Sequence, residues 1–242
     1  MRIIPKIEIK NNYVIKGINF EGLRKLGNPK QFIEKYYNEG CDEIIISDIV
    51  ASLYGRNHLF KLIEEITKSV FIPITLIGGL RSISDIDKAF NSGADKVGLN
   101  SILIKNPNFL KDLINKYGEA NIVVSVETRK VEGIWKIFYL NGREPANLTL
   151  KEWISKLLSI GFGELLVNSI DYDGTFKGPD IELINEIKSL NIKKPIIYSA
   201  GIGKYNDIIL LNKIFKNQAI SISSALHYKK MELKKIYKLI NQ

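Results

Sequence analysis

Three acidic side chains stand at or just after the ends of apolar, β-branched runs, where parallel strands would bring them to one cavity. Glu8 ends the first such run, Glu127 ends one in mid-chain, and Asp173 follows a third. Two carboxylates across one cavity suit general acid–base chemistry, because repulsion and partial burial separate their proton affinities. A single solvated carboxylate at a strand end is common, so it is the symmetrical recurrence of Glu8 and Glu127 that favours a catalytic pair.

Turns that contain glycine, serine or asparagine form a second set of candidates. Glycine lets backbone N–H groups approach an anion, and Asn or Ser side chains add donors. One such turn could simply make a tight connection. Several of them at strand ends in both halves predict two anion sites, which would hold a molecule with a phosphate at each end. The turns are Ile77-Gly78-Gly79, Gly98-Leu99-Asn100-Ser101, Asp173-Gly174-Thr175, Ser199-Ala200-Gly201 and Ser223-Ser224.

The elements that would position these residues alternate regularly. Short β-branched runs and longer segments of helical period follow one another, as in a parallel sheet wrapped by helices. Strands are expected at Ile3–Ile9, Glu43–Ile49, Pro73–Ile77, Lys96–Leu99, Ile122–Glu127, Glu164–Ser169, Pro195–Ser199 and Ala219–Ser223. Helices are expected at Pro29–Asn38, Leu59–Ser69, Ile83–Asn91, Pro107–Lys116, Leu150–Ser159, Asp180–Ser189, Tyr205–Phe215 and Met231–Ile240. Eight strands and eight helices in strict alternation predict an α/β fold, a single (β/α)8 barrel domain over residues 1–242.

An internal repeat supports the barrel. Residues of matching type recur at an offset of about 120 positions, which predicts two half-barrels related by a pseudo-twofold axis. A long loop, Asn11–Asn28, is expected after the first strand. A second long segment, Lys130–Asn147, follows the fifth strand and contains Asn141-Gly142, a hairpin turn signal. The matching pairs are Glu8 and Glu127, Gly40 and Gly161, and Gly78 and Ala200.

Composition narrows the function classes. The net charge is +9, but the lysines are spread along apparent helix faces that also carry acidic residues, which favours an anionic substrate over nucleic acid. The sequence contains no run of about 18 apolar residues, so no membrane-spanning helix is expected. Cys41 is the single cysteine, so neither an intramolecular disulfide nor a cysteine metal cluster is expected. We expect no metal and no cofactor, and, since residues 1–5 lack a signal peptide, a cytoplasmic protein.

These motifs, taken together, resemble the cyclase subunit of imidazole glycerol phosphate synthase over nearly the whole chain. The Asp-x-Asp-Gly-Thr run distinguishes it from the sister sugar isomerase of histidine synthesis. The resemblance is carried by Arg2-Ile-Ile-Pro5, Val14-Ile-Lys-Gly17, Gly27-Asn-Pro29, Asp42-Glu43, Asp48-Ile49, Phe71-Ile-Pro73, Gly78-Gly79, Gly93-Ala-Asp-Lys-Val97, Asn100-Ser101, Asn106-Pro107, Ile170-Asp-Tyr-Asp-Gly-Thr175 and Ser224–His227.

The resemblance implies a lyase/cyclase of histidine biosynthesis with a separate glutaminase partner. In that family the glutaminase docks on the N-terminal face of the barrel, and ammonia crosses the barrel to its C-terminal end. There it meets a bisphosphorylated ribulosyl-formimino carboxamide, and two aspartates act as acid and base in cleavage and ring closure to imidazole glycerol phosphate.

The resemblance also implies roles for individual residues. Glu8, Glu127 and Asp173 would be catalytic, together with Lys16, which stands in place of a lysine on the mobile loop that closes over substrate. Phosphate would bind at Gly79, Asn100 and Ser101 on one side and at Asp173, Gly174, Gly201 and Ser224 on the other. Arg2, Glu43, Lys96 and Glu164 match a charged ring at the channel entrance, which could be an ammonia gate or a structural salt-bridge plug.

Some positions depart from the family pattern. Glu8 and Glu127 replace aspartates, which moves each carboxylate outward by about 1.5 Å, a displacement that can cost about 100-fold in rate. Lys6 should face inward and replaces a small uncharged residue, while Ser47 and Asn168 stand where the passage is lined by more apolar or smaller groups. A buried lysine needs a partner, here Glu8 or Glu127. Lys6 could then obstruct ammonia, or act on a carbonyl substrate itself.

Three functions remain open from the sequence. The first is the ammonia-dependent cyclase. The second is a diverged paralogue that channels ammonia for amidation of another compound, such as a surface sugar, or acts on a different phosphosugar. The third is a non-catalytic conduit in which Glu8 and Glu127 are only structural. A barrel alone decides between none of them.

Overall fold

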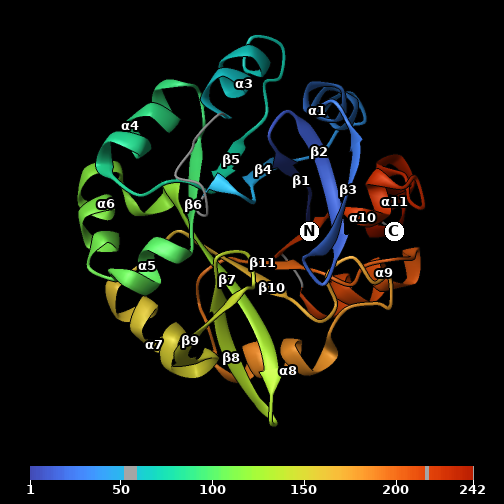
Figure 1. The fold of residues 1–242 in the computed structure, drawn as a ribbon. Helices are drawn as coiled ribbons and strands as arrows, with labels where there is room; N and C mark the ends of the chain where they lie inside the picture. Colours follow the sequence, from blue (N-terminus) through green and yellow to red (C-terminus); the bar gives the residue numbers. More distant parts are fainter. Residues whose placement is uncertain (52–58, 216–217, 242) are drawn as a thin grey trace.

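Eight parallel strands close into a barrel, seen along its axis in Figure 1. The computed structural model describes residues 1–51, 59–215 and 218–241. Each strand pairs in parallel with the next, and the last pairs with the first. The predicted (β/α)8 barrel is therefore confirmed. Its strands are β1 (Arg2–Lys10), β4 (Ile44–Asp48), β5 (Ile74–Ile77), β6 (Lys96–Leu99), β7 (Ile122–Val131), β10 (Glu164–Ser169), β11 (Ile196–Ser199) and β12 (Ala219–Ile222).

Helices surround the strands on the outside of the barrel (Figure 1). They are α1 (Pro29–Asn38), α3 (Leu59–Ile66), α4 (Ile83–Asn91), α6 (Phe109–Tyr117), α7 (Leu150–Ile160), α8 (Ile181–Ser189), α9 (Tyr205–Ile214) and α11 (Leu233–Ile240). All overlap the predicted segments; α3 ends before the predicted Ser69 in a turn where Thr67 Oγ1 donates to the Ile63 carbonyl. The short helices α5 (Ser101–Lys105), α10 (Ser224–His227) and η1 (Glu119–Asn121) were not predicted, since so few residues show no period.

Local sequence determines where several helices begin. Asn28 caps α1 with its side chain, just ahead of a proline that needs no hydrogen-bond partner for its nitrogen. Ser82 and Asp85 form a reciprocal capping box at α4, as do Thr149 and Glu152 at α7. The starts of α1, α4 and α7 are therefore fixed by residues next to their first turns.

Two separate apolar clusters form the core. The larger one lies between strands and helices, and the smaller fills the barrel interior. Because side chains alternate along a strand, residues two positions away from an interior one also face inward. The interior cluster thus fixes which strand residues point into the barrel. Its members are Ile4, Ile45, Ile77, Val123, Leu166, Ile197 and Ala219.

Two antiparallel hairpins extend from the barrel at equivalent places. After β1 come β2 (Tyr13–Ile18) and β3 (Glu21–Gly27); after β7 come β8 (Ile134–Tyr139) and β9 (Glu144–Thr149). The turn expected at Asn141-Gly142 is confirmed, with both residues at positive φ. The segment 11–28 was expected as a loop, and this is wrong. Its turn is Asn19-Phe20, also at positive φ, and lacks the glycine that would have marked it.

The backbone repeats between the two half-barrels. Gly78 has φ 99° and its counterpart Ala200 has φ 109°, while the following Gly79 and Gly201 have φ 71° and 77°. With the matching hairpins after β1 and β7, this agrees with the repeat expected from the sequence. Ala200 thus holds a conformation that suits glycine better.

Replacing Ala200 with glycine should raise the free energy of unfolding by about 1 kcal/mol. Glycine relieves the strain of the positive φ, and the substitution removes only one methyl group from the packing. Urea unfolding would measure the change. The same substitution at Ala89, buried in the middle of α4, is the matched control and should destabilise by about 1 kcal/mol or more. A loss of stability in both variants would contradict the strain at Ala200.

Candidate active site

Glu8, Lys16 and Asp173 form a buried ion-pair network at the C-terminal end of the barrel. Lys16 reaches inward from β2, and its Nζ lies 2.6 Å from Glu8 Oε2 and 2.6 Å from Asp173 Oδ1. From below, Lys6 Nζ lies 3.2 Å from Glu8 Oε1. Of the two partners expected for Lys6, the structure therefore pairs it with Glu8. Residues from β1, β2 and the loop after β10 therefore meet at the Lys16 ammonium group.

These contacts determine the charge states. Burial alone would raise the pKa of Glu8, but the ammonium groups of Lys16 and Lys6 outweigh it and lower the pKa to about 2. Burial would lower the pKa of Lys16, yet Asp173 and Glu8 raise it above its ordinary value. Burial also raises the pKa of Asp173, against the opposing effect of Lys16. Glu8 and Lys16 are therefore ionised at neutral pH.

Glu127 differs from Glu8 in its surroundings. Its Oε2 accepts a hydrogen bond from the Gly142 backbone N–H at 2.8 Å, and it has no ion pair within 4 Å in the described part of the chain. Burial raises its pKa to about 7, with Gly142 and the more distant Lys6 opposing. The two glutamates thus have well-separated proton affinities: one is fixed as an anion, and the other can hold or release a proton near neutrality.

The predicted phosphate-binding residues gather around two cavities, one in each half. Gly79, Asn100 and Ser101 line the first, of about 220 Å³, which also reaches Glu127. Gly174, Gly201 and Ser224 line the second, of about 20 Å³, together with Lys16 and Asp173. The structure brings each set together, while phosphate binding itself stays a prediction.

Two cationic side chains at the first cavity were not singled out from the sequence. Arg81 follows the Gly78-Gly79 turn by two residues, and Lys105 ends the short helix α5; both line the first cavity. The position of Arg81 directly behind a glycine turn was a usable signal. Lys105 gave none, because α5 was itself unpredicted.

The β2–β3 hairpin is fastened over the loop that follows β10. Asn19 Nδ2 donates to the carbonyls of Ile170 and Asp171 at 3.2 and 2.8 Å, and the Asn19 N–H donates to the Asp173 carbonyl at 2.8 Å. Gly174 lies so close that a Cβ there would come within 2.3 Å of the Gly17 carbonyl oxygen. This close approach requires glycine at position 174. It also positions Lys16 next to the carboxylates of Glu8 and Asp173.

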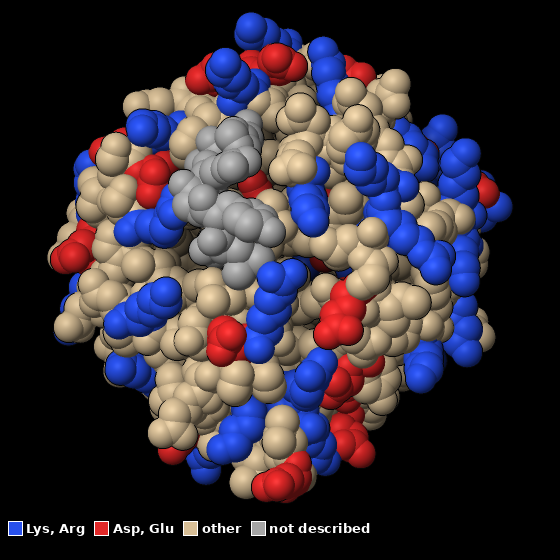
Figure 2. Space-filling view, viewed as in Figure 1, with Lys and Arg blue, Asp and Glu red and all other residues tan. Residues whose placement is uncertain are grey.

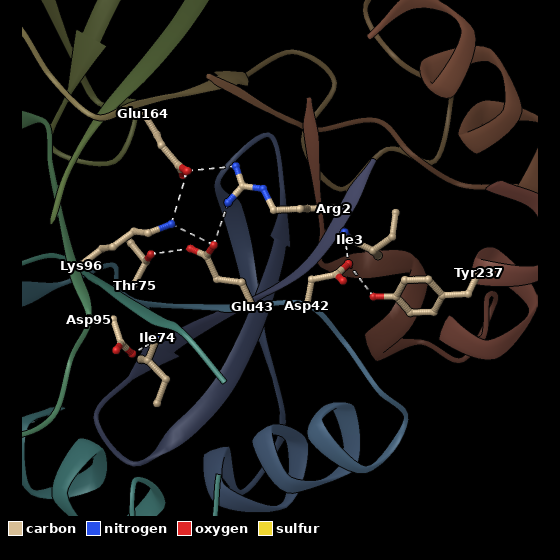
Figure 3. A network of polar contacts seen from close by, with 10 residues as sticks. All are labelled: Arg2, Ile3, Asp42, Glu43, Ile74, Thr75, Asp95, Lys96, Glu164 and Tyr237. Carbon is tan, nitrogen blue, oxygen red and sulfur yellow. Dashed lines mark hydrogen bonds and ion pairs between the residues drawn. The ribbon is translucent and has the colours of Figure 1, made fainter. Parts of the chain in front are cut away.

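At the opposite end, Arg2, Glu43, Lys96 and Glu164 form a closed ring of ion pairs (Figure 3). Arg2 lies 3.0 Å from Glu43 and 2.9 Å from Glu164, and Lys96 lies 3.0 and 3.3 Å from the same two carboxylates. Thr75 Oγ1 also donates to Glu43 at 2.7 Å. The expected pairing of two cations with two anions is thus present at the N-terminal end of the barrel, and whether it works as a gate or a plug is a question of function.

Replacing Glu43 with glutamine should lower the free energy of unfolding by about 3 kcal/mol, because it breaks a buried pair and leaves two cations to share Glu164. Chemical denaturation would measure the loss. Glu34→Gln, in an exposed pair 3.9 Å from Lys30, is the matched control and should change stability by about 0.5 kcal/mol or less. Equal losses in the two variants would refute the stabilising role of the ring.

Sequence comparisons place the chain in a family. A family model described as "Histidine biosynthesis protein" matches residues 2–232. The chain belongs to this family. Among similar proteins, one from Legionella pneumophila is 40% identical over 208 residues, which are 86% of this chain and 98% of that protein. A protein from Helicobacter hepaticus is 38% identical over 234 residues, which are 96% of this chain and 92% of that protein. One from Dehalococcoides mccartyi is 39% identical over 230 residues, which are 94% of this chain and 89% of that protein. All three are named imidazole glycerol phosphate synthase subunit HisF.

Family membership confirms the resemblance found in the sequence and favours the first of the three functions over the diverged paralogue and the conduit. It identifies the chain as a cyclase of this type. The roles of individual site residues are not decided by it.

Basic side chains lie at several places on the face of the molecule that Figure 2 shows. On the face that carries both hairpins, Lys and Arg are spread among other residues (Figure 2). Within residues 1–51, 59–215 and 218–241, no helix is long and apolar enough to cross a membrane, and no three His, Cys, Asp or Glu side chains gather as metal ligands would.

Proposed function

We infer that this chain is the ammonia-dependent cyclase subunit of imidazole glycerol phosphate synthase. Its substrate is the bisphosphorylated ribulosyl-formimino carboxamide, which it converts to imidazole glycerol phosphate. The inference rests on the similarity of the chain, over most of its length, to proteins of that name. It also rests on two inward glutamates whose pKa values are shifted in opposite directions, that of Glu8 downward and that of Glu127 upward.

Glu8 and Glu127 would divide the proton transfers. Glu8 is ionised in the free chain and would be the base that accepts a proton from the reacting nitrogen or carbon. Because Lys6 and Lys16 lower its pKa to about 2, at least one of these ion pairs must separate when substrate binds before Glu8 can act as a base. Glu127, with a pKa of about 7, is protonated in a large fraction of molecules at neutral pH and donates to the leaving group. Both are one methylene longer than the aspartates of the family pattern, so the substrate would sit correspondingly farther from β1 and β7.

The two cavities would hold the two phosphates. In the first, the Gly79 backbone, Asn100 and Ser101 offer donors, and Arg81 and Lys105 add positive charge. In the second, Gly174, Gly201 and Ser224 offer donors beside Lys16. A substrate anchored at both ends would span the space between the half-barrels, where the carboxylates lie.

Ammonia would come from a glutaminase subunit docked on the N-terminal face. The ring of Arg2, Glu43, Lys96 and Glu164 lies at that end of the barrel, and its ion pairs must separate to open a passage. In this role the ring is a gate whose opening the partner triggers, and its stability in the isolated chain keeps ammonia from leaking backward.

The direct test supplies the purified chain with the bisphosphorylated carboxamide and an ammonium salt, at a pH basic enough to provide free ammonia. Imidazole glycerol phosphate should form without the partner, and glutamine should replace ammonium once the glutaminase is added. The matched variant Glu8→Asp/Glu127→Asp should lose about 100-fold in rate, since its carboxylates retreat from the position set by this chain. Absence of product from the wild type, with product from the double variant, would reject the proposal.

A further inference from the structure

The two lysines that hold the Glu8 carboxylate come from different parts of the fold. Lys6 stands two residues before Glu8 on β1, so both side chains share the inward face of the strand, and Lys6 Nζ lies 3.2 Å from Glu8 Oε1. Lys16 comes from β2, and its Nζ lies 2.6 Å from Glu8 Oε2. Since Glu8 can act as a base only after one of these ion pairs opens, one lysine must leave and the other can stay.

The backbone favours the departure of Lys16. Strand β1 is paired with β12 on one side and with β4 on the other, and Lys6 itself pairs with Ile45 of β4. The β2–β3 hairpin joins the sheet through β1 alone, at the two residue pairs next to the turn that follows β1. The hairpin can therefore swing as a unit once the contacts of its tip are lost, whereas a shift of Lys6 would break the barrel wall.

The counterions favour the same choice. In the described part of the chain Lys6 has one anionic partner within 4 Å, which is Glu8, and a buried ammonium group without its counterion is costly. Lys16 has two anionic partners, Glu8 and Asp173. It also lines both the second cavity and a wider one of about 530 Å³ that shares Gly174 with it. A phosphate group bound there would replace Glu8 as a partner of Lys16, while Lys6 has no such replacement.

The departure of Lys16 leaves Glu8 and Asp173 without their shared counterion. Two buried carboxylates this close to each other cannot both stay ionised, so one of them takes up a proton. Lys6 forms an ion pair with Glu8 and none with Asp173 within 4 Å. The proton should therefore go to Asp173, and Glu8 should keep its negative charge.

The other polar groups around Glu8 do not change this outcome. Burial lowers the pKa of His227 to about 3, so its ring is uncharged at neutral pH. Ser223 Oγ, 3.5 Å from Glu8 Oε2, is neutral. Glu127 faces Lys6 and Asp173 from farther away, and it forms no ion pair with either lysine within 4 Å. Lys6 is therefore the one charge that distinguishes Glu8 from Asp173 once Lys16 has moved.

We propose that Lys6 is a positioning residue, which stays ion-paired with Glu8 when Lys16 moves to the substrate phosphate and so makes Glu8, rather than Asp173, the base. The inference rests on the proposed cyclase function. With both lysines in place, the pKa of Glu8 is too low for an effective base. With Lys6 alone the pKa of Glu8 rises while the group stays ionised, and with neither lysine burial would keep it protonated.

Turnover should depend on Lys6 in a way that changes with pH. With free ammonia held constant and both substrates saturating, the ratio of kcat at pH 6 to kcat at pH 8 should be about tenfold lower in Lys6→Met than in wild type, because Glu8 then takes up a proton in the occupied site. The KM for the carboxamide should change by about twofold or less. Lys111→Met, which removes an exposed lysine of α6, is the matched control and should keep the wild-type ratio. A wild-type ratio in Lys6→Met would contradict the proposal.

A second experiment needs no turnover and follows Glu8 by itself. Lys16→Met reproduces the departure of Lys16, and NMR of side-chain carboxyl carbons labelled with carbon-13 reports the pKa of each acid. The pKa of Glu8 should be lower than that of Asp173 in Lys16→Met, and it should be higher by about 1–3 in Lys16→Met/Lys6→Met. The Glu8 signal is identified by its absence from Glu8→Gln. Lys16→Met/Lys111→Met is the matched control and should show the Glu8 pKa of Lys16→Met.

The outcomes separate this proposal from the proposed function. If the wild type forms no imidazole product, the proposed function fails, and the titration of Glu8 still decides the role of Lys6. An equal pKa for Glu8 with and without Lys6, or a pKa of Glu8 above that of Asp173 in Lys16→Met, would overturn that role. Should Lys16→Met/Lys6→Met not fold, Lys16→Met/Lys6→Gln removes the same charge and keeps a polar side chain inside the barrel.

Discussion

Replacing Lys16 with methionine is expected to lower kcat by at least about 100-fold and the free energy of unfolding at pH 8 by about 3–5 kcal/mol. The ammonium group lies 2.6 Å from both Glu8 and Asp173, so its loss leaves two buried carboxylates facing each other without their shared counterion. Methionine fills a similar volume, which isolates the effect of charge. Steady-state kinetics and urea unfolding would measure the two effects.

Acid should reverse the loss of stability. Without Lys16, the pKa of Glu8 and that of Asp173 both rise, so the native variant takes up protons more readily than the unfolded chain. Its deficit relative to wild type is therefore greatest at pH 8 and shrinks towards pH 5. Lys25→Met is the matched control, because Lys25 is exposed on the neighbouring strand over the Tyr13 ring. This variant should have the wild-type free energy of unfolding at both pH values. A deficit of equal size at both pH values would assign the effect to packing instead.

The barrel could be predicted from the sequence because its signals are local. Each interior strand is a short β-branched run, and caps such as Asn28 and Ser82 mark where helices begin. The β2–β3 hairpin could not be predicted in the same way. Its turn at Asn19-Phe20 carries no glycine, and β3 is exposed at most positions, so it shows no apolar alternation.

In the candidate active site, too, some features follow from local sequence patterns and others depend on long-range packing. That Glu8 and Glu127 point into the barrel could be predicted, because alternation and repeat are sequence properties, although β7 continues beyond Glu127 to Val131. The bridge from Lys16 to Asp173 depends on how the hairpin folds back across residues 157 positions apart, which no local pattern encodes. The opposite proton affinities of the two glutamates depend in turn on that bridge. Long-range packing therefore turns a symmetrical pair of residues into an asymmetrical pair of functional groups.

Glu127 tests that asymmetry. Glu127→Gln should lower kcat by about 1,000-fold, since a neutral amide cannot transfer the proton assigned to this group. In the wild type, kcat/KM should fall as pH rises through about 7, where Glu127 loses its proton. Measurements need free ammonia held constant across the pH range, so that only the enzyme titrates. The variant should lack this alkaline limb in its residual activity.

The free energy of unfolding should also depend on pH through the protonation of Glu127. The folded-state pKa of Glu127 is raised from 4.5 to about 7, so its stabilising protonation is complete below pH 4.5 and is lost as pH rises to 7. The wild type should lose up to about 3 kcal/mol over this window relative to Glu127→Gln. Glu144→Gln, at an exposed position on β9, should leave the pH dependence unchanged. A constant difference between wild type and Glu127→Gln from pH 4.5 to 8 would mean that Glu127 titrates as an ordinary carboxylate, and the acid would have to be sought elsewhere in the cavity.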